Sequence, residues 1–150
     1  MKADSIDQDI RRVLPFLDDG DLPALHSTLL PVDLPAGNTL FRAGESASVV
    51  YFLVSGRLAV QKNTGFADKL QVVALLDPGA PVGEGAVVPG QIRGATVAAI
   101  ENCRLLSLER KTLEILMEQN PALAWKIMTR FLLVSHLRLQ KSSERLARIM

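Results

Sequence analysis

The sequence predicts a mainly β protein of the α+β class, in which an antiparallel β-roll or jelly-roll barrel is flanked by N-terminal helices and a long C-terminal helix. Three patterns predict it: helical spacing of apolar residues near the N-terminus, short apolar segments between turns in the middle, and a C-terminal stretch without glycine or proline. A chain of 150 residues suits one hydrophobic core. We therefore expect residues 1–150 to form a single domain, with helices over 1–30, the roll over 31–108 and helices over 109–150.

The N-terminal segment has the apolar periodicity of helices. From Ser5 to Leu30, apolar residues recur three or four positions apart. Pro15 is expected to end or kink the first helix near Val13. The acidic, glycine-containing break that follows predicts a second, short helix.

The middle of the chain reads as short strands separated by turns. Ser55-Gly56 and Pro78-Gly79 are typical turn pairs, and several of the segments between turns are rich in β-branched residues. This pattern predicts a compact antiparallel roll. The expected strands are Thr39–Phe41, Val49–Val54, Arg57–Val60, Leu70–Leu76, Thr96–Ile100 and Arg104–Leu108.

The C-terminal part predicts two helices. Residues 110–119 have an amphipathic pattern, and Asn120-Pro121 then supplies an N-cap with proline at the first helical position. Neither glycine nor proline follows, so a helix of roughly eight turns is expected to run to Met150.

Composition and charge narrow the class of protein. Hydrophobic residues make up 48%, charged residues 22%, and the net charge is +1, which is typical of soluble globular proteins and creates no overall field for nucleic acid or membranes. The single cysteine, Cys103, excludes an internal disulfide and is expected to be buried. The first residues lack the apolar stretch of a signal peptide, so none is expected, and no apolar run reaches the ~20 residues that span a bilayer. These features predict a cytoplasmic protein.

The segment 83–97 carries the chemistry. Gly83 and Gly85 allow close approach of the backbone to a ligand, and a single helical turn over Gly85–Val88 would aim its free amides at an anion. Arg93 offers a planar fork of donors that matches two phosphate oxygens. The carboxylate of Glu84 cannot help to bind an anion, but it can accept a hydrogen bond from a sugar hydroxyl. Together these groups indicate a nucleotide.

This segment closely resembles the phosphate-binding cassette of cyclic nucleotide-binding domains, the family of catabolite activator proteins, regulatory subunits of cAMP-dependent protein kinase and cyclic-nucleotide-gated channels. The family pattern is Gly-Glu-apolar-Ala, six residues, then Arg-x-Ala-Thr/Ser-Val. Gly83-Glu84-x-Ala86, six residues and Arg93-Gly94-Ala95-Thr96-Val97 match it in identity and spacing. One departure is Gly85, which stands where the family usually has leucine or isoleucine.

The resemblance implies a role for each matching residue. Glu84 is expected to accept from the ribose 2′-OH. Arg93 and the amides of Gly85 and Ala86 are expected to hold the cyclic phosphate, and Thr96 to add a hydroxyl near the phosphate or base. The implied binding residues are Gly83, Glu84, Gly85, Ala86, Arg93, Gly94, Ala95 and Thr96.

The implied ligand is cAMP or cGMP. Family members that prefer cGMP often have threonine at the position of Gly94, so its absence favours cAMP. His26 and His136 are single and distant, and the sequence contains no metal-ligand pattern, P-loop or nucleophile elbow. We therefore expect no metal cofactor and no enzymatic activity.

The last helix suggests a partner. Trp125, Leu132, Leu139 and Leu146 recur every seven residues, which permits a two-stranded coiled coil. The alternative is one stripe that packs on the chain's own roll. The resemblance to catabolite activators favours a homodimer. By the same resemblance, Ser142 and Ser143 are candidates for contacts with the purine; otherwise they are solvated.

The basic residues of this helix have two interpretations. From Pro121 onward the sequence contains six Lys or Arg and a single acidic residue, Glu144. A solvated face is favoured over binding of nucleic acid or membrane, because no aromatic residues accompany these charges on the polar side.

Sequence reasoning therefore predicts a sensor or regulatory domain that binds a cyclic nucleotide and relays binding through its C-terminal helix. Two alternatives stay open. One is a fragment of a catabolite-activator-type transcription regulator, because the sequence ends at Met150 without the helix-turn-helix that such proteins carry after the long helix. The other is a ligand-free structural or dimerisation module on the same fold.

Overall fold

The turn-bounded apolar segments pair into two antiparallel sheets that face each other. In a computed structural model, which describes residues 2–63, 65 and 69–150, each sheet has four strands. In the order β1-β8-β3-β6, the first sheet contains β1 (Leu30–Leu34), β8 (Cys103–Glu109), β3 (Val49–Ser55) and β6 (Pro81–Val82). In the order β2-β7-β4-β5, the second contains β2 (Thr39–Phe41), β7 (Thr96–Ala99), β4 (Leu58–Asn63) and β5 (Leu70–Leu76).

The inward side chains of the two sheets form the core of the roll. Leu53 on β3, Leu105 on β8 and Leu58 on β4 are fully buried in this cluster, together with Val97 of β7. Successive residues of a strand point to opposite faces of the sheet, so the apolar residues at alternate positions gather in the interior of the roll. Cys103, at the start of β8, is also buried there, and burial raises the pKa of its thiol.

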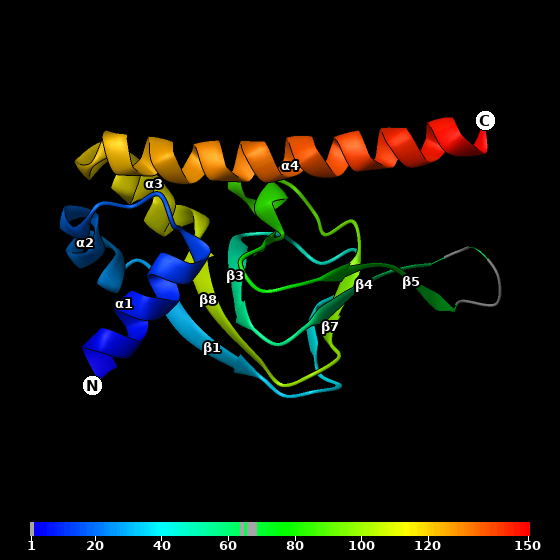
Figure 1. Ribbon diagram of the computed structural model, residues 1–150, viewed down its shortest axis with the longest axis horizontal. Coiled ribbons are helices and arrows are strands. Elements are labelled where there is room, and N and C mark those ends of the chain that lie inside the picture. The colour runs from blue at the N-terminus through cyan, green and yellow to red at the C-terminus, as the bar shows by residue number, and fades with distance from the viewer. Residues whose placement is uncertain (1, 64, 66–68) are drawn as a thin grey trace.

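Helices cover one end of the roll and build a second core against it (Figure 1). The helices are α1 (Lys2–Val13), the 3₁₀ turn η1 (Asp19–Asp21), α2 (Leu22–His26), α3 (Arg110–Gln119) and α4 (Pro121–Ile149). Phe131 of α4 stacks on Phe52 of β3, with ring centroids 5.6 Å apart. The side chain of Asn120 accepts from the Leu123 amide at 3.2 Å, which is the predicted N-cap of α4.

The long helix α4 has two different halves. Its first half buries Leu123, Ala124, Ile127 and Phe131, whereas no residue after Phe131 is buried. Figure 1 shows α4 running along the whole molecule, with its C-terminal half on the same side as the β4–β5 hairpin. Among the described residues, no helix combines the length and apolar character needed to cross a bilayer.

The predicted fold class is confirmed, and the differences are local. Leu30 was expected in the N-terminal helical segment but begins β1, where it pairs with Ser107. Strand β6 was not predicted, because two residues are too few to display an alternating pattern. Arg57 was expected in a strand but precedes β4, and β8 extends one residue past the predicted end of the roll.

Candidate functional site

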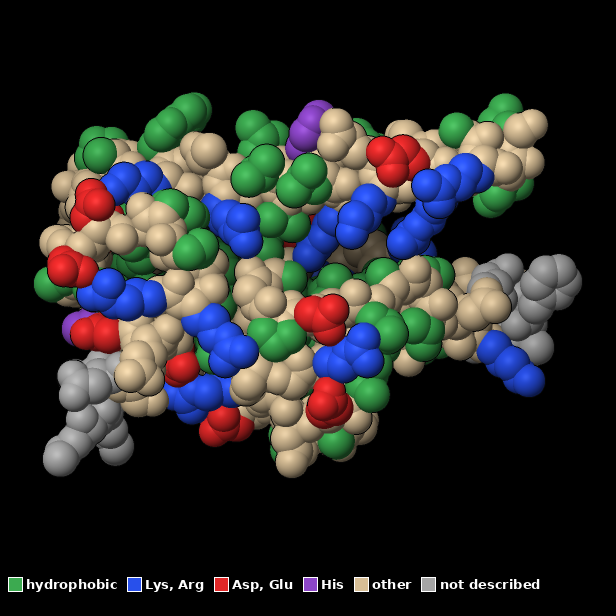
Figure 2. All heavy atoms as spheres, in the orientation of Figure 1, with side chains coloured by type: hydrophobic (Ala, Val, Ile, Leu, Met, Phe, Trp, Pro, Cys, Tyr) green, Lys and Arg blue, Asp and Glu red, His purple; other side chains and the backbone are tan. Residues whose placement is uncertain are grey.

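A cleft of about 1100 Å³ lies between the roll and the second half of α4. One wall is the segment around the 3₁₀ turn η2 (Glu84–Val87), and another is the β4–β5 hairpin. Figure 2 shows a hollow below the long helix, bordered by Lys and Arg side chains. The predicted phosphate-binding segment therefore faces a cleft rather than flat surface.

Arg93 enters the floor of this cleft. It is only 7% exposed, its Nη2 donates to the Val49 carbonyl at 2.7 Å, and its Nη1 donates to the Gly83 carbonyl at 3.3 Å. Its Nε is buried without a hydrogen-bond partner among the described residues. No carboxylate of the described residues forms an ion pair with it. Burial lowers the pKa of this guanidinium, although Tyr51 and Glu45 act in the opposite direction.

Phe41 and Gly83 shape the place that Arg93 occupies. The guanidinium carbon lies 4.0 Å from the centroid of the Phe41 ring, a cation–π arrangement. Gly83 has φ +72°, and a Cβ at this position would overlap Nη1 of Arg93. Glycine is therefore required at 83 both for its backbone conformation and for the space beside the guanidinium.

Glu84 and Arg93, although both are charged and belong to one segment, do not pair with each other. Its Oε1 accepts from Ser135 Oγ at 3.1 Å and from Arg138 Nη1 at 2.9 Å, both on α4. The side chain of Glu84 is 18% exposed and lines the cleft. The two charged groups of the predicted site thus lie in one cleft with separate partners.

The remaining predicted residues divide into two groups. Gly83, Glu84, Gly85, Ala86, Arg93, Gly94 and Ala95 line the cleft. Thr96 is not among the lining residues, and its Oγ1 accepts from the Ala43 amide at 3.1 Å. Its expected hydrogen bond near the phosphate or base stays a prediction, as do the roles assigned to the other seven.

The short helical turn lies one residue earlier than expected. It spans Glu84–Val87 rather than Gly85–Val88 and is a 3₁₀ turn. The amide of Ala86 donates to the Gly83 carbonyl at 3.1 Å. A ligand that uses this amide has to share or displace that bond.

Comparison with known proteins identifies the architecture. The sequence profile described as "cyclic nucleotide-binding domain" matches residues 31–120, more than half of the chain.

The chain belongs to the cyclic nucleotide-binding domain family.

Individual relatives agree with this assignment. A putative potassium channel protein of Rhodopseudomonas palustris is 33% identical over 108 residues, which cover 72% of this chain and 26% of the channel protein. The chain therefore spans about a quarter of that relative. In structure, a cyclic nucleotide-binding domain from Methylobacillus flagellatus superimposes with a TM-score of 0.85 and 21% identity, over 99% of this chain and 84% of the other. The regulatory domain of Toxoplasma gondii PKA in complex with cAMP gives a TM-score of 0.62 and 26% identity, over 76% of this chain and 44% of that one.

Several contacts in this cyclic nucleotide-binding domain escaped sequence reasoning. Phe41 and the Val49 carbonyl hold Arg93 from strands about 50 residues earlier, and Ser135 and Arg138 hold Glu84 from about 50 residues later. The sequence places Phe41 only at the end of an expected strand. No short-range pattern carries these pairings, because strand register and helix docking create them.

The α4 wall of the cleft is basic. The lining residues that α4 contributes include Arg130, Arg138, Lys141 and Arg145, and Arg138 alone of these four forms an ion pair within the described part of the chain. Ser142 also lines the cleft, whereas Ser143 does not. The expectation of a uniformly solvated basic face is therefore incomplete, because part of that face borders the cleft.

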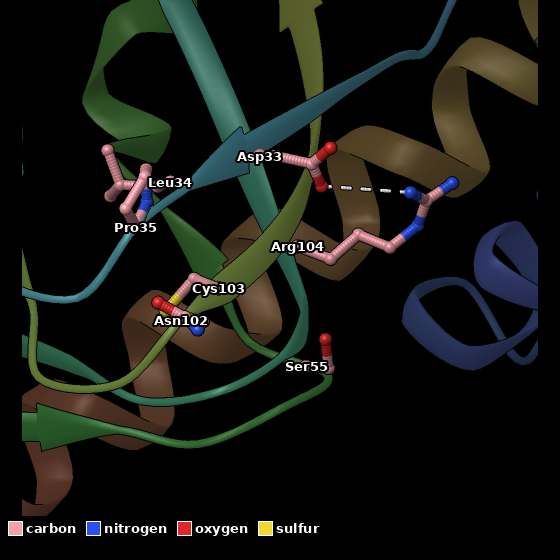
Figure 3. Close-up of a pocket in the computed structure, with 7 residues that line it drawn as sticks. All are labelled: Asp33, Leu34, Pro35, Ser55, Asn102, Cys103 and Arg104. Atoms are coloured by element: carbon pink, nitrogen blue, oxygen red, sulfur yellow. Dashed lines mark ion pairs between the residues drawn. The ribbon is translucent and has the colours of Figure 1, made fainter.

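A second hollow, of about 400 Å³, lies at the sheet that contains β1, β8 and β3 (Figure 3). Cys103 and Asn102 line it together with Asp33 and Arg104, and these last two form an ion pair at 3.7 Å. It contains neither Arg93 nor Glu84 and lies away from the predicted cassette. Within the described residues, no cluster of three or more His, Cys, Asp or Glu side chains is placed to hold a metal ion.

Proposed function

We propose that this domain is a sensor for a cyclic nucleotide, with cAMP favoured over cGMP, and that ligand binding is relayed through α4. In this proposal Arg93 holds the cyclic phosphate and Glu84 accepts from the ribose 2′-OH. Gly94 has no side chain to contact a guanine, which supports cAMP. The ligand undergoes no chemical change at the site.

The observation that carries the proposal is the uncompensated charge of Arg93. A guanidinium that is 7% exposed, with a buried Nε and no carboxylate partner in the described structure, has lost hydration without gaining an opposite charge. Buried charges are normally paired. A cyclic phosphate at this position supplies the missing negative charge and an acceptor for Nε, and the ring of Phe41 keeps the guanidinium plane in place.

One observation favours a second candidate, a ligand-free module on the same fold. Glu84 already has two hydrogen-bond donors from α4, and two carbonyls already accept from Arg93. A domain that had lost its ligand would be expected to satisfy its polar groups internally in this way. Against it stands the buried Nε of Arg93, which internal contacts leave without an acceptor.

Calorimetric titration with cAMP and cGMP separates the two candidates. We expect saturable binding by the wild type and a loss of at least about a hundredfold in Arg93→Ala, because breaking a buried charged pair costs ~3–5 kcal/mol. Arg93→Lys, which keeps the charge but loses the fork, is expected to fall between them. Arg42→Ala, which changes an exposed arginine outside the lining of the cleft, is the control and should bind as the wild type does.

Circular dichroism and thermal melting check that each variant folds. Equal binding by wild type and Arg93→Ala would remove Arg93 from the site. No heat with either nucleotide, from a folded wild type, would favour the ligand-free module.

The output of the whole protein is a separate part of the proposal. The chain covers only a quarter of the channel relative, so the element that receives the signal is proposed to be a partner copy or an attached domain rather than this roll. A homodimer through α4 is proposed, as is a cytoplasmic location, without contacts from this chain to nucleic acid or membrane.

A further inference from the structure

Three hydrogen bonds connect α4 to the segment around Glu84. Arg138 Nη1 and Ser135 Oγ donate to Glu84 Oε1, at 2.9 and 3.1 Å, and Arg138 Nη2 donates to the Pro81 carbonyl at 2.8 Å. We call this set of four residues the clasp. Ser135 and Arg138 are three positions apart, so both project from one face of the helix.

The clasp uses only one oxygen of the carboxylate. Both bonds end on Oε1, and Oε2 of Glu84 makes no hydrogen bond within the described part of the chain. A carboxylate offers about four acceptor positions on its two oxygens. Glu84 also lines the cleft. Its carboxylate can therefore accept a hydrogen bond from a ligand hydroxyl while Ser135 and Arg138 of α4 stay bonded to Oε1.

Arg138 differs from its basic neighbours on α4. Arg130, Lys141 and Arg145 line the same cleft but form no ion pair among the described residues, whereas Arg138 binds both the Glu84 carboxylate and a backbone carbonyl of the roll. The side chain of Arg138 is 37% exposed and that of Glu84 is 18% exposed, so the pair is partly shielded from water. Because Nη1 and Nη2 donate to two different acceptors, they fix the plane of the guanidinium more closely than a single ion pair does.

From this geometry we propose that Arg138 is a positioning residue. It orients the Glu84 carboxylate to accept a hydrogen bond from the sugar hydroxyl, and it connects that carboxylate to α4. The inference rests on the proposed function, since it assigns the sugar to Glu84. Arg138 acts through Glu84 and needs no contact with the ligand. It follows that preference for a ribose over a 2′-deoxyribose depends on a residue of α4.

The test compares cAMP with 2′-deoxy-cAMP by calorimetry in the wild type, Arg138→Gln, Ser135→Ala and Lys141→Gln. A hydrogen bond to a charged group suggests that the wild type prefers cAMP by roughly 10- to 100-fold. In Arg138→Gln the preference should shrink to within about threefold. In Ser135→Ala it should fall by less, because Arg138 still binds both Glu84 Oε1 and the Pro81 carbonyl. Lys141→Gln is the matched control: it removes a positive charge from the same wall, so it can weaken both ligands, but the ratio should stay that of the wild type.

The ratio of the affinities for cAMP and 2′-deoxy-cAMP is the decisive measurement, because a merely structural change would weaken the binding of both ligands alike. An unchanged preference in Arg138→Gln would overturn the inference. Tighter binding of cAMP by Arg138→Gln than by the wild type would also overturn it, since Arg138 would then compete with the ligand. Failure of the proposed function gives a different result, namely a folded wild type that binds neither nucleotide.

Hydrogen exchange supplies a second readout. We expect cAMP to slow amide exchange around residues 135–138 of α4 in the wild type more than in Arg138→Gln, because the occupied carboxylate fixes the clasp. Equal protection in both proteins would contradict a link from the sugar to α4 through Arg138.

Discussion

Two glycines of the cassette have opposite structural demands, although they are only two positions apart. Gly83 has φ +72° and lies against Nη1 of Arg93, whereas an added Cβ at Gly85 would meet no atom within 4 Å and the backbone there does not require glycine. Glycine at 83 leaves room for the Arg93 guanidinium, whereas position 85 has open space for a side chain.

This contrast gives a prediction for paired alanine variants. Gly83→Ala places a methyl group on Arg93 in a left-handed backbone conformation, so the guanidinium has to move and the affinity for cAMP should fall by about tenfold or more. Gly85→Ala should bind cAMP within about threefold of the wild type, because it reduces only the conformational freedom of the unfolded chain and the turn. Titration of both variants beside the wild type is the measurement, and equal losses in the two would contradict the assigned role of Gly83.

For individual residues, the sequence predicted which members of segment 83–97 lie at one site, but not the contacts that orient their side chains. Seven of the eight proposed residues line one cleft because they are close in sequence and separated only by a tight turn. The orientation of Arg93 depends on Phe41 and the Val49 carbonyl, and that of Glu84 on α4. Those contacts arise from packing between distant elements, which spacing within the cassette does not contain. The same packing turned the Thr96 hydroxyl to the Ala43 amide.

Among the elements, α4 is attached to the N-terminal helices by an ion pair as well as by apolar contact. Lys126 Nζ donates to Asp21 Oδ2 at 3.0 Å and to Asp18 Oδ2 at 3.3 Å, next to the buried Ile127. Burial alone raises the pKa of Asp21, but the hydrogen bonds from Lys126 and from the Asp18 amide outweigh it, so the pKa of Asp21 in the folded protein is lowered.

The lowered pKa of Asp21 gives a pH-dependent prediction. A carboxyl whose pKa is lower in the folded chain contributes stability above its unfolded pKa of about 3.9 and loses that contribution as the pH falls through the folded value. Asp21→Asn should therefore lower the melting temperature by on the order of 1–3 °C at pH 7, and the difference from the wild type should shrink as the pH falls below about 3.9.

Thermal melting at pH 7 and at pH 3 provides the measurement. Glu118→Gln, an exposed carboxylate on α3 without an ion pair in the described structure, should melt like the wild type at pH 7. A difference between Asp21→Asn and wild type that persists unchanged at pH 3 would contradict the ionic origin of the effect.

The boundaries of the two C-terminal helices followed the sequence, because a cap marks the start of the second. Asn120-Pro121 located the start of α4, and residues 110–119 form α3 as predicted. The boundary at Leu30 was missed because its side chain, 53% exposed, continues the helical spacing although the chain already pairs with β8. Pairing decided that residue, and a tertiary contact cannot be seen in local periodicity.

For the whole molecule, the outward face of α4 is an exposed apolar surface. Trp125, Leu132, Leu139 and Leu146, spaced seven residues apart, are 73%, 72%, 66% and 58% exposed. The alternative in which this stripe packs on the chain's own roll is wrong, since residues such as Ile127 and Phe131 do that instead. Apolar side chains line the upper side of the helix in Figure 2. This arrangement supports the proposed homodimer.

Sedimentation velocity tests the dimer. We expect the wild type to sediment as a dimer and the double variant Leu132→Glu/Leu139→Glu as a monomer, because two charges per chain would be buried against each other in the interface. Ile100→Glu, which alters an exposed apolar residue outside α4, should remain dimeric. A wild type that is monomeric at every concentration tested would contradict the proposed interface.

The unequal anchoring of α4 has a mechanical consequence. The buried residues of α4 lie between 123 and 131, and the 18 residues from Leu132 to Ile149 extend about 27 Å beyond them, attached to the roll through the clasp. A tilt of about 10° at the anchored end would displace the far tip by roughly 5 Å, given the 1.5 Å rise per residue. If ligand binding shifts α4 at Arg138, about 10 Å from the end of the buried half, the far tip is expected to move about two and a half times as far.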